Sequence, residues 1–431
     1  MPEEFKPLEM AKKSETFCIL PWIHQYVGPL GEVTPCCVFT HQQAFSNSAK
    51  PLGDLKENTL EEVWNNEETK QLRLKFLKGE IDKRCDFCNI RRSSPFYDEF
   101  NREYLELPEV KDIIKNTKTD GTVENHKLFY IDVRWNNLCN FKCRMCSPHY
   151  STSWIDDHRQ LYGHAKASYS FMFSGKTKDD LLEQIMPHCE TAKMIYFAGG
   201  EPLIQKEHYE VLLRLLELGR TDVMIRYNTN FSQLKLKNYD NVLEYWKQFK
   251  NIEIGASIDG SYERAEYWRH GTKWNQIVEN AKNLKEQVPQ ATLNLSYTLS
   301  WVNAHNLIDL HKEWLKLGFI GFEDLRISCL STPPYYSLKS IPLWKKQEIE
   351  KMFNEYILWG KKTAPLEYYY FETLVKNAID FMYDTNEKDD PKIHMPEFIR
   401  ITKKLDGIRG EDFFSVFPEH LDIKEAYGND S

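Results

Sequence analysis

Two hydrophobic patterns alternate along most of the chain. In one, apolar residues recur every three or four positions, as at Trp274, Ile277, Val278, Ala281 and Leu284, which is typical of an amphipathic helix. In the other, short runs rich in β-branched and aromatic residues predict buried strands. Six such strands are predicted, at Phe129–Trp135, Met194–Ala198, Val223–Tyr227, Ile252–Ile258, Thr292–Thr298 and Leu325–Cys329. Strands that alternate with helices in this way predict a parallel sheet.

The repeated strand and helix units before residue 335 predict the fold class. Gly219 and Gly318 stand where two of the helices would end, since glycine readily adopts the left-handed conformation of a C-cap. Six units predict an α/β fold, an open or partial (β/α)6 barrel, with functional groups at the carboxyl ends of the strands. The predicted domains are an N-terminal module (1–115), a linker (116–127), the barrel (128–335) and a helical C-terminal extension (336–431).

The N-terminal module is predicted to be irregular except for one helix. Thr59 and Glu62 form a capping-box pattern, and Leu60, Val63 and Trp64 supply the apolar face.

Charge and hydropathy exclude two classes of partner. The 431 residues include 56 basic and 64 acidic side chains, giving a formal charge of −8, which disfavours a nucleic-acid-binding protein. No apolar run approaches the roughly 18 residues that span a bilayer, and the segment from Met1 to Ser14 is charged where a signal peptide would be apolar. We therefore expect a cytoplasmic protein that binds neither nucleic acid nor membrane.

Ten cysteines are many for a reducing compartment, where clustered cysteines bind metal or perform redox chemistry. Cys139, Cys143 and Cys146 follow the first predicted barrel strand with the spacing C-x3-C-x2-C. Three thiolates on a tight loop suit a 4Fe-4S cluster and leave one iron open to another ligand. The alternative is a structural zinc site in which His149 supplies the fourth ligand.

A turn after the second predicted strand adds a family resemblance. Together with the cysteine triplet, Gly199, Gly200, Glu201 and Pro202 resemble the radical SAM superfamily, with a departure at Met145, where an aromatic residue often precedes the last cysteine. The resemblance implies that the open iron binds S-adenosylmethionine (SAM) and that the reduced cluster cleaves it to a 5′-deoxyadenosyl radical. It also implies an electron donor such as flavodoxin or ferredoxin, and a peptide or small-molecule substrate that loses a hydrogen atom.

Further polar residues at the strand ends suit SAM within that resemblance. The two glycines let the backbone approach its amino end, and Glu201 offers an acceptor to its ammonium. The remaining candidates are Ser257 and Asp259 for the ribose hydroxyls, Arg269 and Ser296 for the carboxylate, and Asn228 for either. Each of these residues taken alone also fits an ordinary turn, cap or surface position. No catalytic acid or base is assigned, because hydrogen-atom abstraction requires positioning more than proton transfer.

The N-terminal cysteines resemble a second iron-sulfur site. Their pattern is similar to a shortened SPASM module, the twitch domain, and implies one auxiliary 4Fe-4S cluster. The residues of this pattern are Cys18, Gly31, Cys36, Cys85 and Cys88. Such modules usually follow the barrel, whereas this one precedes it. Cys37 is an alternative ligand to Cys36, and a four-cysteine zinc site is the alternative to a cluster.

Two other functions are compatible with the sequence. One is a SAM-dependent dehydrogenase of a small metabolite, which needs an enclosed pocket rather than an open groove. The other is a non-catalytic scaffold in which both cysteine groups hold zinc, and this alternative predicts a colourless protein.

Overall fold

The computed structural model describes residues 5–39, 50–85, 88, 95–163 and 169–428. Within this part the chain forms two compact units. Unit 1 comprises Met1–Asn136, Met172–Gly199 and Lys206–Ile225, and unit 2 comprises Asn137–Phe171, Gly200–Gln205 and Arg226–Ser431. The four domains drawn from the sequence stay a prediction.

The strands of unit 1 follow the order β3-β2-β1-β4-β5. They are β1 (His24–Val27), β2 (Glu32–Thr34), β3 (Gly53–Asp54), β4 (Tyr130–Val133) and β5 (Met194–Phe197). Strands β1, β4 and β5 are parallel. Strand β2 pairs with β1 in antiparallel orientation, and β3 pairs with β2 in antiparallel orientation. The sequence predicted β4 and β5 but no strand in the N-terminal module, because β1 to β3 are too short to show an alternating pattern.

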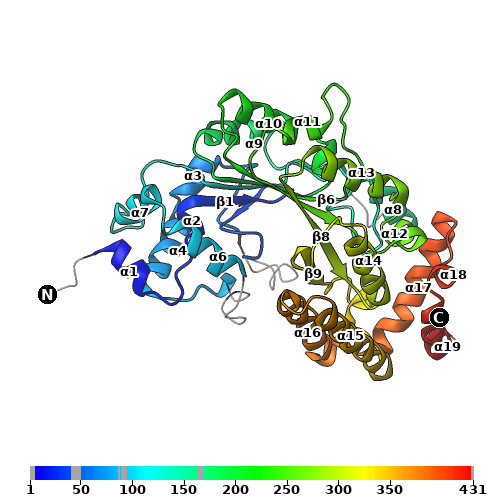
Figure 1. Ribbon diagram of the computed structural model, residues 1–431. Helices are drawn as coiled ribbons and strands as arrows, with labels where there is room; N and C mark the ends of the chain where they lie inside the picture. Colours follow the sequence, from blue (N-terminus) through cyan, green and yellow to red (C-terminus); the bar gives the residue numbers. More distant parts are fainter. Residues whose placement is uncertain (1–4, 40–49, 86–87, 89–94, 164–168, 429–431) are drawn as a thin grey trace. The chain divides into compact units, whose positions relative to one another are not determined.

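Among the helices of unit 1, α1, α2, α4 and α7 pack together (Figure 1). The helices are α1 (Pro7–Lys13), α2 (Leu20–Ile23), α3 (Leu60–Trp64), α4 (Glu67–Lys78), α6 (Pro95–Tyr104), α7 (Pro108–Lys115), α9 (Asp180–Ile185) and α10 (Lys206–Glu217). The capping box of Thr59 and Glu62 is confirmed at the start of α3. The helix predicted there is interrupted, because Asn66 caps a new helix, α4.

Unit 2 continues the α/β pattern with the strand order β6-β7-β8-β9. These strands are β6 (Met224–Thr229), which enters unit 2 at Arg226, β7 (Ile252–Ser257), β8 (Ala291–Leu299) and β9 (Leu325–Cys329). Strands β7, β8 and β9 are parallel, with Ser257 opposite Ser296. All six strands predicted from the sequence are present, with ends that agree within two residues, so the predicted α/β fold with a parallel sheet is confirmed.

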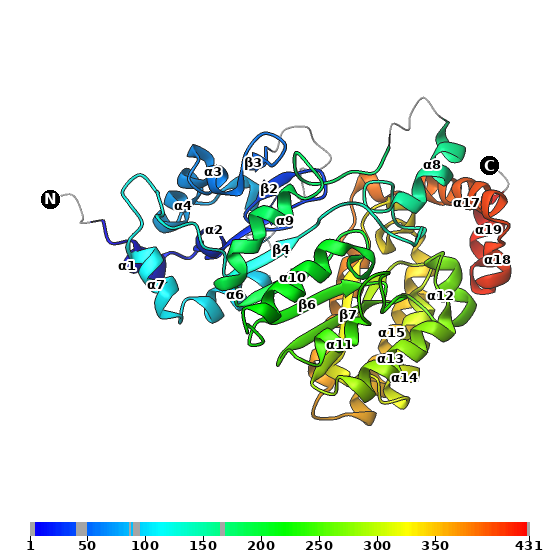
Figure 2. The same cartoon turned by 90° about the horizontal axis from the view of Figure 1, so that it is seen from above.

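Unit 2 also has its own helices, of which α17, α18 and α19 lie together in the C-terminal region (Figure 2). The helices of unit 2 are α8 (Ile155–Tyr162), α11 (Val242–Trp246), α12 (Tyr262–Trp268), α13 (Trp274–Gln287), α14 (Ala304–Lys316), α15 (Leu343–Thr363), α16 (Tyr368–Tyr383), α17 (Pro391–Arg409), α18 (Phe413–Val416) and α19 (Leu421–Tyr427). Gly219 after α10 and Gly318 after α14 have φ values of 69° and 71°, which confirms both predicted C-caps. Among the described helices, none has the length and apolar character that crossing a bilayer requires.

Candidate functional site

The cysteine triplet lies on a loop of unit 2 that pairs with a second segment. Backbone hydrogen bonds of 2.9 Å join Lys142 to His270 and Arg144 to Trp268. Cys143, which lies between Lys142 and Arg144, therefore faces Arg269, which lies between Trp268 and His270. Gly271 continues the second segment at φ 115°, and a Cβ there would lie 2.7 Å from the ring of Phe141, so this close approach requires glycine.

Hydrogen-bond donors point at two of the three sulfurs. Nη1 of Arg269 lies 3.9 Å from Sγ of Cys143. Sγ of Cys139 accepts from the backbone N–H of Phe141 at 3.4 Å and from Nδ2 of Asn230 at 4.0 Å. Donors and a guanidinium beside sulfur stabilise the thiolate form, which is the form that binds metal.

Burial sets the chemistry of the uncoordinated thiols. It raises the pKa of all three, that of Cys146 to about 12, so these thiols are protonated at neutral pH unless a metal compensates the charge. A tetrahedral zinc site with Zn–S bonds of about 2.3 Å holds its sulfurs about 3.8 Å apart. Among the described residues, no three cysteine, histidine or carboxylate donors that include Cys139, Cys143 or Cys146 lie within 4.8 Å of one another. In a cluster, by contrast, separate irons each take one thiolate.

The carboxylate of Glu201 is buried and ties together the ends of two strands. Its Oε1 accepts from the backbone N–H of Leu203 at 3.0 Å and from Oγ1 of Thr229 at 2.6 Å, and its Oε2 accepts from the N–H of Asn230 at 2.6 Å. Burial raises the pKa of Glu201 to about 7, although these hydrogen bonds act in the opposite direction. One lone pair of Oε2 remains for another donor.

The glycines before Glu201 adopt a conformation that other residues avoid. Gly199 has φ 75° and Gly200 has φ 56°. Pro202 then opens a short 3-10 helix, Pro202–Ile204. The turn predicted after the second barrel strand is present, and both of its glycines have positive φ values.

Three predicted residues meet on one face of the strands of unit 2. Ser257 of β7 lies opposite Ser296 of β8 in the register. A Cβ on Gly255 would lie 2.4 Å from Oδ1 of Asn228 and 2.8 Å from Oγ of Ser296. The absence of a side chain at Gly255 therefore lets the polar groups of β6, β7 and β8 converge.

Asp259 and Arg269 form an ion pair. Oδ2 of Asp259 accepts from Nε of Arg269 at 2.7 Å, and Oδ1 accepts from the backbone N–H of Thr298 at 2.7 Å. Both oxygens of this buried carboxylate thus accept hydrogen bonds from the protein, and Oδ2 holds the guanidinium whose Nη1 lies near Cys143. A contact of Asp259 with ribose stays a prediction.

Arg144, inside the cysteine triplet, joins this loop to the C-terminal helices. Its buried guanidinium binds Asp406, and its Nη2 lies 2.6 Å from Oε2 of Glu411. It also stacks 3.8 Å from the ring centroid of Tyr267. The sequence analysis missed this residue, although its place between two cysteines of the predicted ligand triplet was a usable signal.

A second ion-pair group braces the same loop. Asp157 of α8 accepts from Nζ of Lys142 at 2.9 Å and from Nε of Arg409 at 2.7 Å. Burial acts to raise the pKa of Asp157, but these two cations outweigh it and lower the pKa below its usual value. Nη2 of Arg409 also donates to the carbonyl of Lys142 at 2.9 Å. The C-terminal extension, to which the sequence assigned no chemistry, therefore positions the cysteine loop.

A cavity of about 420 Å³ adjoins Cys146. Five aromatic or imidazole rings line part of its wall. They belong to Trp154, His158, Tyr162, Tyr169 and Tyr335. The volume falls within the range of small-molecule sites.

The N-terminal cysteines approach one another within unit 1. Burial raises the pKa of Cys18, Cys36 and Cys85. The negative charge of a neighbouring thiolate raises these pKa values further, by a smaller amount. Cys88 has this effect on Cys18 and Cys85, and Cys18 and Cys85 have it on Cys36. The four predicted ligands are therefore neighbours, which fits one metal centre. That these four thiols are the ligands stays a prediction.

Cys37 has different surroundings from Cys36. Burial raises its pKa to about 12, the negative charge of Asp132 adds to the rise, and the positive charge of Arg134 opposes it. The thiol thus lies beside an ion pair, in which Nη2 of Arg134 is 3.2 Å from Oδ1 of Asp132.

A local ion-pair group holds the segment before Cys85. Oδ1 of Asp82 accepts from Nε of Arg84 at 2.9 Å, and Oδ2 accepts from Nζ of Lys75 at 2.9 Å. Burial again acts to raise the pKa of Asp82, and the two cations lower it well below its usual value.

Two family models match the chain. Residues 18–89 match an iron-sulfur cluster-binding domain, SPASM, and residues 133–312 match the radical SAM superfamily. No curated protein matches the chain.

The solved structures that match the chain are distant from it in sequence. The structure of anSMEcpe with bound AdoMet is 17% identical, with 53% of this chain and 59% of that chain covered and a TM-score of 0.36. SuiB of Streptococcus suis bound to S-adenosylmethionine is 15% identical, with 68% and 64% covered and a TM-score of 0.35. SuiB bound to its precursor peptide SuiA is 14% identical, with 64% and 60% covered and a TM-score of 0.35. The chain spans about three fifths of the length of these structures.

Proposed function

The chain belongs to the radical SAM superfamily and carries an auxiliary iron-sulfur cluster-binding domain, and on this premise we propose that it starts radical chemistry on a peptide or small-molecule substrate. Its cofactors are a SAM-binding 4Fe-4S cluster, an auxiliary cluster and SAM. When bound and reduced, the SAM-binding cluster supplies the electron that cleaves SAM to methionine and a 5′-deoxyadenosyl radical, which removes a hydrogen atom from the substrate. The source of the electron is a donor protein such as flavodoxin or ferredoxin.

The residues that would hold the SAM-binding cluster are Cys139, Cys143 and Cys146. Arg269 and Asn230 stabilise two of the thiolates through the contacts described above. The buried Asp259 keeps the Arg269 guanidinium fixed, so that its charge need not reorganise when a thiolate forms.

Other residues would bind SAM itself. The free lone pair of Glu201 accepts from the ammonium group, and the backbone of Gly200 leaves room for it. The convergent side chains of Asn228, Ser257 and Ser296 suit hydroxyl and carboxylate groups. The single observation that carries the proposal is the triplet loop, in which two of the three sulfurs face donors and the spacing leaves one iron open.

The substrate class stays open between two candidates. The cavity beside Cys146 accommodates a small metabolite or one side chain of a peptide. Both dehydrogenation of a metabolite and modification of a peptide begin with the same hydrogen-atom abstraction.

Anaerobic reconstitution of the full-length protein tests the proposal. We expect about eight irons per chain, and 5′-deoxyadenosine after addition of SAM and dithionite. The triple variant C139A/C143A/C146A should lose about four irons and form no 5′-deoxyadenosine. Cys189→Ala is the matched control, because this buried cysteine belongs to neither group. Zinc in place of iron, or 5′-deoxyadenosine formation by the triple variant, would contradict the proposal.

A further inference from the structure

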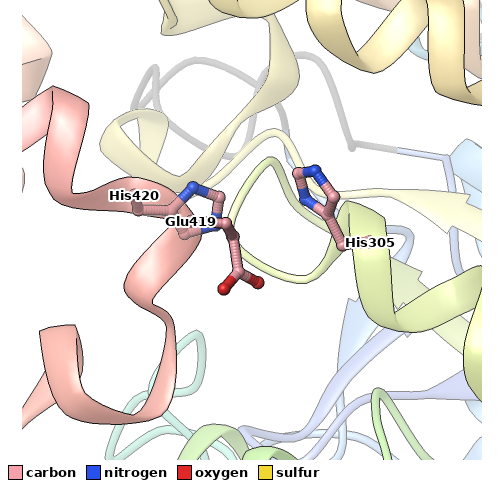
Figure 3. A group of neighbouring side chains, drawn as sticks. All are labelled: His305, Glu419 and His420. Carbon is pink, nitrogen blue, oxygen red and sulfur yellow. The ribbon is translucent and has the colours of Figure 1, made fainter.

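A third set of metal-type donors lies in unit 2, outside the cysteine segments. One donor atom from each of His305, Glu419 and His420 lies within 4.8 Å of the other two. Figure 3 shows that they come from two separate segments, the first turn of α14 and the short 3-10 helix Pro418–His420. His420 is fully buried, and the side chains of His305 and Glu419 are 25% and 19% exposed.

Each of these three residues has one polar atom without a hydrogen bond. Nδ1 of His305, Nδ1 of His420 and Oε1 of Glu419 are buried and bond to no described residue. Nη1 of Arg264 is 3.0 Å from Oε1, as an ion-pair contact without hydrogen-bond geometry. Folded proteins rarely leave buried polar atoms unpaired, and three in one group call for a common partner.

The contacts of the other ring nitrogens, Nε2 of His420 and Nε2 of His305, indicate which nitrogen of each ring is the acceptor. Nε2 of His420 lies 2.9 Å from the carbonyl of Val302, so Nε2 carries the proton and Nδ1 keeps its lone pair. Nε2 of His305 lies 3.3 Å from Oε1 of Glu348, which favours the same tautomer. Imidazoles that bind metal through one nitrogen commonly donate the other N–H to a carbonyl or a carboxylate.

The surrounding charges leave room for a cation. Oε2 of Glu419 accepts from Nη2 of Arg264 at 3.0 Å, and Oε1, which has only the ion-pair contact with Nη1, would be the oxygen that a metal shares with this guanidinium. Nζ of Lys345, from α15, is 3.1 Å from Glu348 and 2.9 Å from Asp422. Three carboxylates therefore face two cations, and with neutral imidazoles the group carries one net negative charge.

We propose that His305, Glu419 and His420 bind a divalent transition metal of the zinc type, with a fourth position for water. Two imidazoles and one carboxylate are a zinc donor set, whereas Mg²⁺ and Ca²⁺ prefer sites made of oxygen alone. The metal joins the 3-10 helix Pro418–His420 to the start of α14 and satisfies all three unpaired atoms. The partial exposure of His305 provides the entry path.

Zinc binding to the cluster-loaded, full-length protein tests this site. The probe is Zn²⁺ alone, with zinc and iron per chain counted by mass spectrometry and the zinc ligands identified by X-ray absorption. We expect about one zinc per chain with a nitrogen and oxygen shell, and a higher Tm in its presence. His305→Ala and Glu419→Gln should each weaken zinc binding about 100-fold at unchanged iron content.

Two further variants keep the test decisive. Glu348→Gln leaves all three ligands in place and should weaken binding about tenfold through the outer contact of His305. His394→Ala, which changes a histidine of α17 outside this group, should bind zinc like the wild type. Sulfur ligands to the bound zinc, equal binding by the wild type and His305→Ala, or no zinc at all would overturn the proposal. These counts do not depend on SAM cleavage, so the site and the proposed function fail separately.

Discussion

The two cysteine-bearing regions are each stabilised by an ion-pair group of the same composition. The two groups differ in how far apart their residues lie in the sequence. In each, a buried carboxylate is held by one lysine and one arginine, and one of these cations directly precedes a cysteine. The N-terminal group is Asp82 with Lys75 and Arg84, all within ten residues. The group at the triplet is Asp157 with Lys142 and Arg409, the last 252 residues away in sequence.

The difference shows what each site depends on. The N-terminal group is made by its own segment, so the chain before Cys85 is ordered locally. The triplet loop depends on α17, because Arg409 and the carboxylates bound to Arg144 come from the C-terminal helices. Damage to the C-terminal extension should therefore reach the SAM-binding cluster and spare the auxiliary one.

Arg409→Met should give the largest effect. The Arg409 side chain is fully buried, and its removal leaves Asp157 buried with one cation fewer, at a cost of about 3–5 kcal/mol in the free energy of unfolding. Urea unfolding measures this loss, and iron analysis should show preferential loss of the SAM-binding cluster. A variant that keeps full iron and full stability would show that the brace is not needed.

Arg84→Met should act in the same way but more weakly. Arg84 is 16% exposed, and Lys75 remains on Asp82, so we expect a loss of about 1–3 kcal/mol. Iron should be lost from the auxiliary site, with SAM cleavage retained. Arg159→Met, which removes an exposed ion pair with Asp156, is the matched control and should cost less than about 0.5 kcal/mol. If Arg84→Met abolished SAM cleavage, the separation of the two regions would be wrong.

Acid should weaken both groups together. Asp82 and Asp157 have pKa values below the usual 3.8, so the unfolded chain binds more protons than the folded one as the pH drops past that value. Their stabilisation is present above pH 3.8 and is lost as the pH falls through the folded pKa values. Asp82→Asn and Asp157→Asn should each flatten the fall in stability that the wild type shows below about pH 4, measured by urea unfolding. Slopes equal to that of the wild type would contradict this account.

Thr59→Ala should have the smallest effect. It tests whether a loss of stability outside both charge groups changes metal retention. The variant loses the hydroxyl that caps α3 in unit 1, for about 1 kcal/mol of unfolding free energy. Iron content and SAM cleavage should stay at wild-type levels, because no part of either charge group is touched. A cluster lost on this change would mean that general stability, and not the charge groups, controls metal retention.

The features that the sequence predicted are those that a short window contains. The strands, the capping box at Thr59, the C-caps at Gly219 and Gly318 and the cysteine spacing each lie within a few residues. Strands β1 to β3 were not predicted, because two to four residues are too few to show an alternating hydrophobic pattern. Strand β1 is stabilised by pairing with β4, which lies far along the chain.

Long-range contacts account for the rest of what was missed. Asn230 beside Cys139, Thr298 beside Asp259 and Arg409 beside Asp157 join residues whose types are ordinary in isolation. Nothing local distinguishes such an asparagine or arginine from a surface residue, since its partner is chosen by the fold.

Because Arg409 lies far from Lys142 in the sequence, the two cysteine-bearing regions become stabilised at different times during synthesis. A ribosome that adds about 5–20 residues per second releases Arg409 roughly 15 to 50 seconds after Lys142, because 267 positions separate them. Until then the triplet loop lacks its brace, whereas the N-terminal group is complete once Arg84 emerges. Iron delivered to the nascent chain thus meets an ordered N-terminal segment first, and stable loading of the triplet waits for the finished polypeptide.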